Sequence, residues 1–468
     1  MKILLVRNHD IGNVNTRLPE SLNKAQGIYP PLGLAYIAAV LEKAGHKVSI
    51  LDSQALNLTT PEIKDYISKE SPDVVGVTCM TPNVRGALEV MKLSKEVSKD
   101  IITVIGGPQI SVFPNETLSF DFVDYGIFGE GENAMLELVN NIKEGKVVSN
   151  ITGLVYKKNG KVIINQASLI ENLDELPFPA RHILPNEKYH CVISRNPFTT
   201  MITGRGCPYR CGFCFKGPAD RNIRLRSAKN VVDEMEHCIE KYKVKEIMFY
   251  DDTITFNREH IKNICNEIIE RKIDIDWEAP TRIDCVDEEI LKLMKKAGCI
   301  RLRYGVESGD QKILEIMRKR ITIEKIEDIF KITKKIGIEA FAYFIIGYAT
   351  EDEKTIRNTI NFAKKLDPDW AMFTVATPLP FTNLYDLSIE KGLIDSDYWK
   401  NFVLGKTNER IPFLVEGSDE WVKKAYKEFY LRPRFFLKKI YKIRSFDTIK
   451  KYMRGFNSIF SFEMKPQN

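Results

Sequence analysis

The 468-residue chain carries 69 basic and 63 acidic side chains, a net charge of +6, and 44% of its residues are hydrophobic. This length allows about three domains with buried cores, and a slight positive excess without a long basic run disfavours nucleic acid and favours a small-molecule substrate. The opening "MKILLVRNHD" soon turns polar, and no uncharged apolar stretch approaches the roughly 18 residues of a membrane span, so we expect a cytoplasmic protein.

The first 145 residues alternate apolar runs with amphipathic stretches. The runs "KILLV", "KVSIL", "DVVGVTCM" and "IITVIGG" are separated by helix-like sequence, which predicts a doubly wound parallel sheet over residues 1–145. Sheets of this kind bind ligands beyond the carboxyl ends of their strands. In residues 146–190, Asn159-Gly160 predicts a β-hairpin and a segment with two prolines predicts a linker.

A second alternation begins at Thr199. Six units, from "TTMITGRG" to "WAMFTVATPLP", predict a full or partial parallel β/α barrel over residues 191–405, with its chemistry at the carboxyl ends of the strands. Residues 406–468 are aromatic and basic, which predicts a helical C-terminal cap on the barrel or, alternatively, a peripheral membrane contact.

Three of the nine cysteines lie together in "GRGCPYRCGFC", at Cys207, Cys211 and Cys214. Scattered cysteines elsewhere are unlike the disulfide framework of a secreted protein. A [4Fe-4S] cluster normally takes four thiolates, so three thiolates leave one iron for another ligand.

The other cysteines allow a different interpretation of the triplet. His190, Cys191 or Cys238 could complete a structural zinc site, although the spacing is unlike a usual zinc finger or ribbon. We expect five isolated cysteines to be small buried side chains: Cys79, Cys238, Cys265, Cys285 and Cys299.

The segment "CPYRCGFC" and the six β/α units resemble the radical S-adenosylmethionine (SAM) enzymes over residues 191–405. The resemblance implies a [4Fe-4S] cluster on Cys207, Cys211 and Cys214, with SAM chelating the fourth iron. It also implies an external electron donor, a flavodoxin or ferredoxin, and reductive cleavage of SAM to a 5′-deoxyadenosyl radical.

The strand ends of the predicted barrel match SAM contacts of that family. "YDDT" and "GVESG" stand where relatives contact SAM, while Phe381 replaces the glycine of the sixth-strand pattern and puts that turn in doubt. The alternative is that these charged residues cap helices or form ordinary ion pairs. The resemblance implies the following SAM-binding residues: Phe213, Asp251, Asp252, Arg282, Arg303, Glu307, Ser308 and Gly347.

The N-terminal region resembles the cobalamin-binding domain of B12-dependent radical SAM proteins. "NHDIGN" is similar to a loop whose histidine coordinates cobalt, but Arg7 stands where an orienting aspartate is expected, and a solvated loop histidine is the alternative. No G-x-G-x-x-G follows the first strand, which argues against a dinucleotide. The resemblance implies these cobalamin-binding residues: His9, Thr78, Thr81, Gly106, Gly107 and Gly129.

The combined pattern predicts a cobalamin-dependent radical SAM enzyme, similar to B12-dependent methyltransferases and the anaerobic magnesium-protoporphyrin ester cyclase. Such an enzyme methylates an unactivated carbon, or closes or rearranges a ring. The alternatives are a radical SAM enzyme without cobalamin and a non-catalytic iron-sulfur electron-transfer protein. Tyr430, Arg432 and Arg434 in the aromatic, basic C-terminal region hint at a lipid, isoprenoid or tetrapyrrole substrate.

Overall fold

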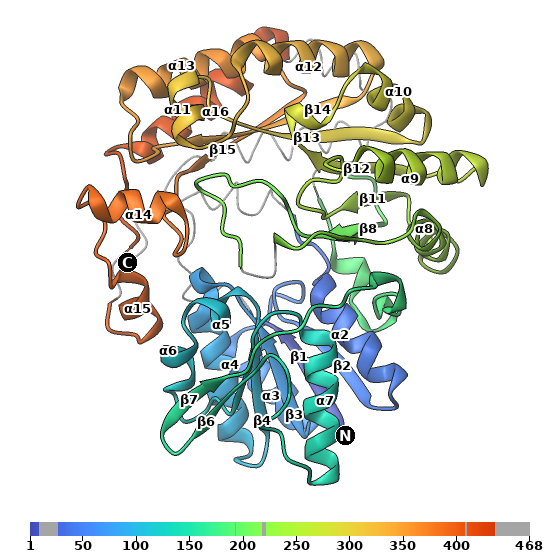
Figure 1. Ribbon diagram of the computed structural model, residues 1–468, viewed down its shortest axis with the longest axis vertical. Coiled ribbons are helices and arrows are strands. Elements are labelled where there is room, and N and C mark those ends of the chain that lie inside the picture. The colour runs from blue at the N-terminus through green and yellow to red at the C-terminus, as the bar shows by residue number, and fades with distance from the viewer. Residues whose placement is uncertain (9–26, 192, 218–220, 408–409, 436–468) are drawn as a thin grey trace.

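The computed structural model describes residues 1–8, 27–191, 193–217, 221–407 and 410–435. Figure 1 shows two α/β units stacked along the long axis, with the N-terminal unit in blue to cyan below and the later unit in green to orange above. The chain therefore has the α/β architecture predicted from its alternating pattern.

The N-terminal sheet has seven strands in the order β2-β1-β3-β4-β5-β6-β7. Its first five strands are parallel, while the predicted hairpin adds β6 and β7 antiparallel at one edge, as part of the sheet. Inner strands of such a sheet are buried on both faces and so read as continuous apolar runs. The strands are β1 (Lys2–Arg7), β2 (Lys47–Asp52), β3 (Val74–Thr78), β4 (Ile102–Gly106), β5 (Tyr125–Ile127), β6 (Leu154–Lys158) and β7 (Lys161–Ile164).

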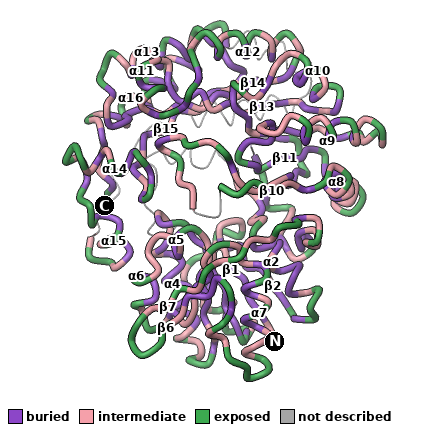
Figure 2. Tube along the Cα trace, in the orientation of Figure 1, coloured by how far each residue is buried: buried purple, intermediate pink, exposed green. Residues whose placement is uncertain are grey.

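Helices cover both faces of this sheet. α2 and α7 pack together on one face, and α3 and α4 pack together on the other. In Figure 2 the strands between them are largely purple, the colour of buried residues. The helices are α2 (Leu32–Lys43), α3 (Thr60–Glu70), α4 (Val84–Val97), α5 (Pro108–Val112), α6 (Pro114–Leu118) and α7 (Gly131–Glu144).

The second unit is a partial barrel. Its six parallel strands run in the order β15-β14-β13-β12-β11-β8 and match the six predicted units. In β14 and β15 every second residue is buried against helices, and the intervening residues on the concave side are only half-buried. The strands are β8 (Phe198–Met201), β11 (Glu246–Phe249), β12 (Asp276–Thr281), β13 (Cys299–Glu307), β14 (Glu339–Ile346) and β15 (Trp370–Val375).

The barrel helices begin at side chains suited to capping. Ser227, Asn257 and Asp287, for example, each accept a hydrogen bond from a backbone N–H of the helix that follows, which satisfies a donor that lacks a partner within the helix. The helices are α8 (Ala228–Tyr242), α9 (Arg258–Glu270), α10 (Glu288–Lys296), α11 (Gln311–Ile316), α12 (Ile323–Ile336) and α13 (Glu353–Leu366).

Three helices follow the last barrel strand: α14 (Asn383–Glu390), α15 (Tyr398–Val403) and α16 (Ser418–Tyr430). α15 returns to the N-terminal unit and packs near α6, as Figure 1 shows, whereas α16 packs on β15 and α13. Within the described residues, the aromatic side chains of α16 are thus part of a cap on the barrel. No helix in this part of the chain combines the length and apolar character that a membrane crossing requires.

Candidate functional site

The three clustered cysteines lie on one loop at the carboxyl end of the first barrel strand. β9 (Gly204–Arg205) pairs antiparallel with β10 (Arg224–Leu225), and the cysteines lie in the connection between them. Cys207 is buried, and the Cys214 N–H donates to the Cys211 carbonyl at 3.1 Å, which closes a tight turn. The loop thus holds three thiols in one short, folded segment.

Backbone contacts fix the middle of this cysteine loop. Gly212 N–H donates to the Met317 carbonyl, and the Gly212 carbonyl accepts from Leu384 N–H, both at 2.8 Å. A Cβ on Gly212 would lie 3.0 Å from Tyr348 Oη, a contact close enough to require a shift of that ring. Glycine at this position therefore lets the loop dock against the barrel and α14.

The arrangement is unlike a site for one metal ion. Among the described residues, no three His, Cys, Asp or Glu side chains converge on a point where a single ion could bind. Cys191 accepts a hydrogen bond from Tyr29 Oη at 3.3 Å, and Cys238 lies in the barrel core. Neither Cys191 nor Cys238 is thus placed to complete a zinc site with the triplet. A [4Fe-4S] cluster takes each thiolate on a different iron and can take another ligand on the fourth iron.

The paired aspartates after β11 have different partners. Asp251 is buried and accepts from Thr203 N–H at 3.0 Å and from Thr203 Oγ at 2.7 Å. Burial raises its pKa to about 6, although the Thr203 hydrogen bonds oppose the shift. Asp252 pairs with Lys216 of the cysteine loop at 2.6 Å. Asp251 thus holds the end of β8, and Asp252 faces the loop.

Two arginines that were expected to bind SAM also have partners within the protein. Arg282, at the end of β12, donates to Cys211 Sγ at 3.4 Å and pairs with Asp284. Arg303, on β13, pairs with the fully buried Glu278 and donates to Tyr343 Oη at 3.3 Å. The structure thus brings Arg282 to the cysteine loop and leaves Arg303 on the concave side of the barrel.

The end of β13 forms a buried, partly strained turn. Glu307 has a positive φ of 70° and pairs with Lys319 at 2.7 Å. Ser308 is fully buried and lies 3.1 Å from Thr359 Oγ on α13. Non-glycine residues with positive φ are uncommon and concentrate at functional sites. The backbone conformation of Glu307 therefore makes it a candidate functional residue.

Two further residues expected at SAM lie on the same side of the barrel. Gly347, after β14, has a φ of 82° and donates its N–H to Glu351 at 2.7 Å. The Lys319 ammonium lies 5.9 Å from the centre of the half-buried Phe213 ring. Lys319, which the sequence reading did not single out, therefore lies between Phe213 of the cysteine loop and Glu307.

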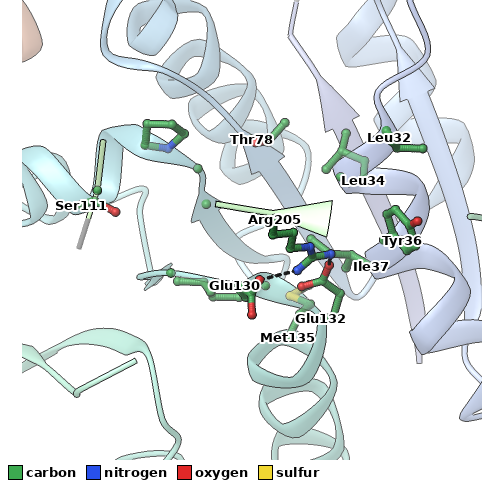
Figure 3. Close-up of a pocket in the computed structure, with 18 of the residues that line it drawn as sticks. Leu32, Leu34, Tyr36, Ile37, Thr78, Ser111, Glu130, Glu132, Met135 and Arg205 are labelled. Atoms are coloured by element: carbon green, nitrogen blue, oxygen red, sulfur yellow. Dashed lines mark hydrogen bonds and ion pairs between the residues drawn. The ribbon is translucent and has the colours of Figure 1, made fainter. Parts of the chain in front are cut away.

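A cavity of about 490 Å³ lies between the two units, against the carboxyl ends of the N-terminal strands. Thr78, Gly106, Gly107 and Gly129 line it, as Thr78 shows in Figure 3. Thr81 is buried in the turn after β3. This location agrees with the expectation for a doubly wound sheet with strand order 2-1-3-4-5.

The glycines of the cavity wall suit a flat, bulky ligand. A Cβ on Gly106 would meet nothing within 4 Å, so its backbone borders open space. Gly107 has a φ of 93°, and a Cβ there would lie 2.6 Å from the Cys79 carbonyl oxygen, so only glycine fits without strain. These features fit a corrin lying on the strand ends. His9, the predicted cobalt ligand, lies outside the described residues.

Ion pairs join the cavity wall to the start of the cysteine loop. Arg205 pairs with Glu130 at 2.6 Å and with Glu132, and Arg224 also pairs with Glu130 at 2.6 Å. Figure 3 shows Arg205 reaching between the two carboxylates. The segment "GEGE" supports the resemblance to a cobalamin-binding domain and contains Glu130 and Glu132, but the sequence alone does not pair them with Arg205 or Arg224.

Comparisons with known proteins agree with this two-part site. The B12 binding domain family matches residues 21–139, and the Radical SAM superfamily matches residues 201–363. An uncharacterized methyltransferase of Pyrococcus horikoshii is 37% identical, over 91% of this chain and 93% of that protein. The anaerobic magnesium-protoporphyrin IX monomethyl ester cyclase of Rubrivivax gelatinosus is 31% identical, over 87% of this chain and 75% of that protein.

A solved structure shares the fold. The radical SAM methyltransferase TsrM from Kitasatospora setae, with cobalamin and a [4Fe-4S] cluster bound, has a TM-score of 0.66 at 21% identity; the match covers 82% of this chain and 76% of that one. The predicted fold class and cofactors are thus confirmed. The chain belongs to the B12-binding-domain radical SAM enzymes, the family of cobalamin-dependent methyltransferases and the magnesium-protoporphyrin cyclase, and its cofactors are cobalamin, a [4Fe-4S] cluster and SAM.

Proposed function

We propose that this enzyme transfers a methyl group to an unactivated carbon of a small-molecule substrate. The observation that carries the proposal is the shared cavity, because Thr78 and Gly106 line it from the N-terminal unit while Arg205 and Asp252 line it from the barrel side. Similarity to a methyltransferase over nearly the full length of both chains supports methyl transfer. Similarity to a cyclase keeps ring closure as the second candidate.

The cofactors supply the difficult chemistry, and the protein positions them. When bound, the reduced cluster provides the electron that cleaves SAM, and cobalamin provides the methyl group. We assign Cys207, Cys211 and Cys214 as cluster ligands. The electron would come from an external donor of the flavodoxin or ferredoxin class.

The remaining side chains would divide between binding and positioning. Phe213, Asp252, Glu307 and Gly347 are proposed to contact SAM, since they lie on the cysteine loop or at barrel strand ends. The N-terminal residues that line the cavity are proposed to hold cobalamin. We assign Asp251, Arg282 and Ser308 to positioning, because each is buried and bonds within the protein. Asp252 and Glu307 also pair with lysines, each through one carboxylate oxygen. Arg303 is assigned to the substrate side of the barrel.

The substrate would enter the concave side of the barrel. There Arg303 contacts Tyr343, and Phe341 lies two residues before Tyr343 on the same face of β14. The Arg303–Glu278 ion pair therefore lies beside aromatic rings. This lining suits a substrate with an apolar body and an anionic or polar group. Tyr430 and Arg432, which had hinted at a lipid, isoprenoid or tetrapyrrole, instead bond to Ala371 and Asp367.

One pair of variants tests the cobalamin part of the proposal. Gly106→Leu should fold, because the space above Gly106 is open, but its side chain would enter the cavity and weaken hydroxocobalamin binding at least tenfold. Gly106→Ala is the matched control and should bind within about twofold of the wild type. Binding is measured by absorbance titration of anaerobic protein. Equal affinity of all three proteins would contradict the assignment of this cavity.

Product mass distinguishes the two candidate reactions. Methyl transfer adds one methylene unit to the mass of the substrate, and deuterated methyl-SAM would carry its label into the product. A product that gains no label while SAM is still cleaved to 5′-deoxyadenosine would contradict methyl transfer and favour ring closure or rearrangement.

A further inference from the structure

Arg282 lies directly against the cysteine loop. It follows β12, is 5% exposed, and its Nη1 lies 3.4 Å from Cys211 Sγ. Its guanidinium carbon lies 3.8 Å from the centre of the Tyr209 ring, and Tyr209 stands between Cys207 and Cys211 in the loop. One side chain thus contacts both a thiol and an aromatic ring of the cysteine loop.

Other contacts fix the orientation of the Arg282 guanidinium. Nε and Nη2 donate to the two carboxylate oxygens of Asp284 at 2.8 and 2.9 Å, and Nη2 also donates to the Lys319 carbonyl at 2.7 Å. Such a two-point contact holds a planar guanidinium better than a single bond could. With Nε and Nη2 engaged in this way, Nη1 is directed at the sulfur.

The Tyr209 ring is fixed from its opposite end. Tyr209 Oη lies 2.8 Å from Cys285 Sγ, so the ring is held between this thiol and the guanidinium that stacks on it. An arginine guanidinium stays protonated in proteins. A cation is therefore held beside one of the three thiols.

We infer that Arg282 raises the reduction potential of the [4Fe-4S] cluster by donating an N–H···S hydrogen bond to Cys211. The inference rests on the proposed assignment of Cys211 as a cluster ligand. Hydrogen bonds to cluster sulfurs and nearby charge set such potentials, because a positive donor stabilises the form that holds one more electron. The electron itself comes from a low-potential one-electron donor, and no bond forms or breaks in this step.

A different role for Arg282, pairing with the SAM carboxylate, makes a different prediction. That role would lower the affinity for SAM when Arg282 is replaced, and would leave the potential of the SAM-free cluster unchanged. The N–H···S contact predicts a changed potential before any SAM is added. A potentiometric titration without SAM therefore separates the two.

The experiment compares Arg282→Gln and Arg282→Lys with the wild type, each made with an intact cluster under anaerobic conditions. Electron paramagnetic resonance of the reduced cluster follows the titration with dithionite and redox mediators. We expect the equilibrium constant for reduction of the cluster to be at least tenfold lower in Arg282→Gln than in the wild type. For a one-electron couple this is a shift of the midpoint potential by about 59 mV to more negative values. Arg282→Lys keeps the positive charge but loses the two-point contact with Asp284. The midpoint potential of this variant should therefore shift less than that of Arg282→Gln.

The matched control is Arg258→Gln. Arg258 pairs with Asp287 at 2.6 Å, as Arg282 pairs with Asp284, but it is 38% exposed and lies on α9. The midpoint potential of the cluster in Arg258→Gln should equal that of the wild type. A midpoint in Arg282→Gln equal to the wild-type value would overturn the inference. If this variant assembles no cluster, the midpoint of Arg282→Lys decides in the same way, with an unchanged value overturning the inference.

Different results would contradict the proposed function and the role of Arg282. Failure of the wild-type protein to bind a cluster or cleave SAM would contradict the proposed function. A wild-type protein that does both, with no dependence of its potential on Arg282, would contradict only the inference.

Discussion

At the scale of single residues, a buried carboxylate fixes the loop at the carboxyl end of β14. Glu351 is 8% exposed and accepts N–H groups from Gly347 and Tyr348 at 2.7 and 3.0 Å. Its second oxygen, Oε1, is buried and has no hydrogen-bond partner among the described residues. Burial, reinforced by Asp310 and Asp352, raises the pKa of Glu351 to about 7 despite the two N–H donors.

This shift predicts a pH dependence of stability. The pKa is about 4.5 in the unfolded chain and about 7 in the folded protein. The contribution of Glu351 is therefore fully present below pH 4.5 and is lost as the pH rises through 7. The shift corresponds to about 3 kcal/mol. We expect Glu351→Gln to lose less free energy of unfolding than the wild type between pH 5 and pH 8.

Urea unfolding of both proteins at pH 5 and pH 8 measures this difference. The contributions of other titrating groups cancel, because they are the same in the wild type and in Glu351→Gln. Glu353→Gln is the control, because Glu353 is exposed on the first turn of α13. The same pH dependence in wild type and Glu351→Gln would show that Glu351 does not titrate in this range.

At the scale of elements, α16 protects the open edge of the barrel sheet. β15 is the edge strand, and its backbone would otherwise expose unpaired groups. Tyr430 Oη accepts from Ala371 N–H at 3.0 Å and donates to the Ala371 carbonyl at 2.7 Å, while Tyr426 Oη accepts from Phe373 N–H at 3.2 Å. The tyrosines thus provide partners for backbone groups of Ala371 and Phe373 on the edge strand.

Removing one hydroxyl should therefore destabilise the barrel. Tyr430→Phe leaves two buried backbone groups without their partner, so we expect a loss of about 1–3 kcal/mol in the free energy of unfolding. Tyr242→Phe, at a partly exposed position on α8, should change it by less than about 0.5 kcal/mol. Urea denaturation compares the two. Equal stability of Tyr430→Phe and the wild type would contradict the edge-capping role.

At the scale of the whole molecule, contacts at two places join the N-terminal unit to later parts of the chain. Arg205, at the start of the cysteine loop, pairs with Glu130 and Glu132, which line the cavity. Arg85 of α4 donates to the Phe402 carbonyl of α15 at 3.3 Å and lies 4.1 Å from the Phe402 ring centre. Because the ion pairs lie at the start of the cysteine loop, they fix this loop relative to the N-terminal unit.

A double-mutant cycle tests this interdomain connection. Arg205→Gln should destabilise the protein because it leaves the buried Glu132 carboxylate without this partner. Glu132→Gln should destabilise it less, because Arg205 keeps its ion pair with Glu130. The double variant should be more stable than the sum of the single losses predicts, with a coupling of about 1–3 kcal/mol. Thermal or urea unfolding of the four proteins gives this coupling. Additive losses would mean that the pair contributes nothing as a unit.

The same pair should matter to cobalamin. Because Glu132 and Arg205 line the cavity, we expect Arg205→Gln to weaken hydroxocobalamin binding several-fold while the iron content of the cluster stays at the wild-type level. Absorbance titration and iron analysis measure the two properties. Lost cluster with unchanged cobalamin affinity would place Arg205 with the cysteine loop alone.

Local patterns in the sequence determined the order of strands along the chain, the six barrel units and the three clustered cysteines. Each depends on neighbouring residues, such as the apolar run of β1 or the spacing of Cys207, Cys211 and Cys214. The sequence also located Gly106 and Gly107 at a strand end, because a βα connection follows its strand directly. His9 lies outside the described residues, so its role stays a prediction.

Only the tertiary structure decided which charged residues meet. Arg282 lies 71 positions from Cys211, and Arg205 lies 75 positions from Glu130, so no local pattern pairs them. The expected SAM contacts illustrate the same limit, since Asp251 bonds to Thr203 and Ser308 to Thr359. Hydrophobic periodicity reports which face of an element is buried. The partner of a buried charge depends on how distant elements pack, because desolvation makes pairing necessary but does not choose the partner.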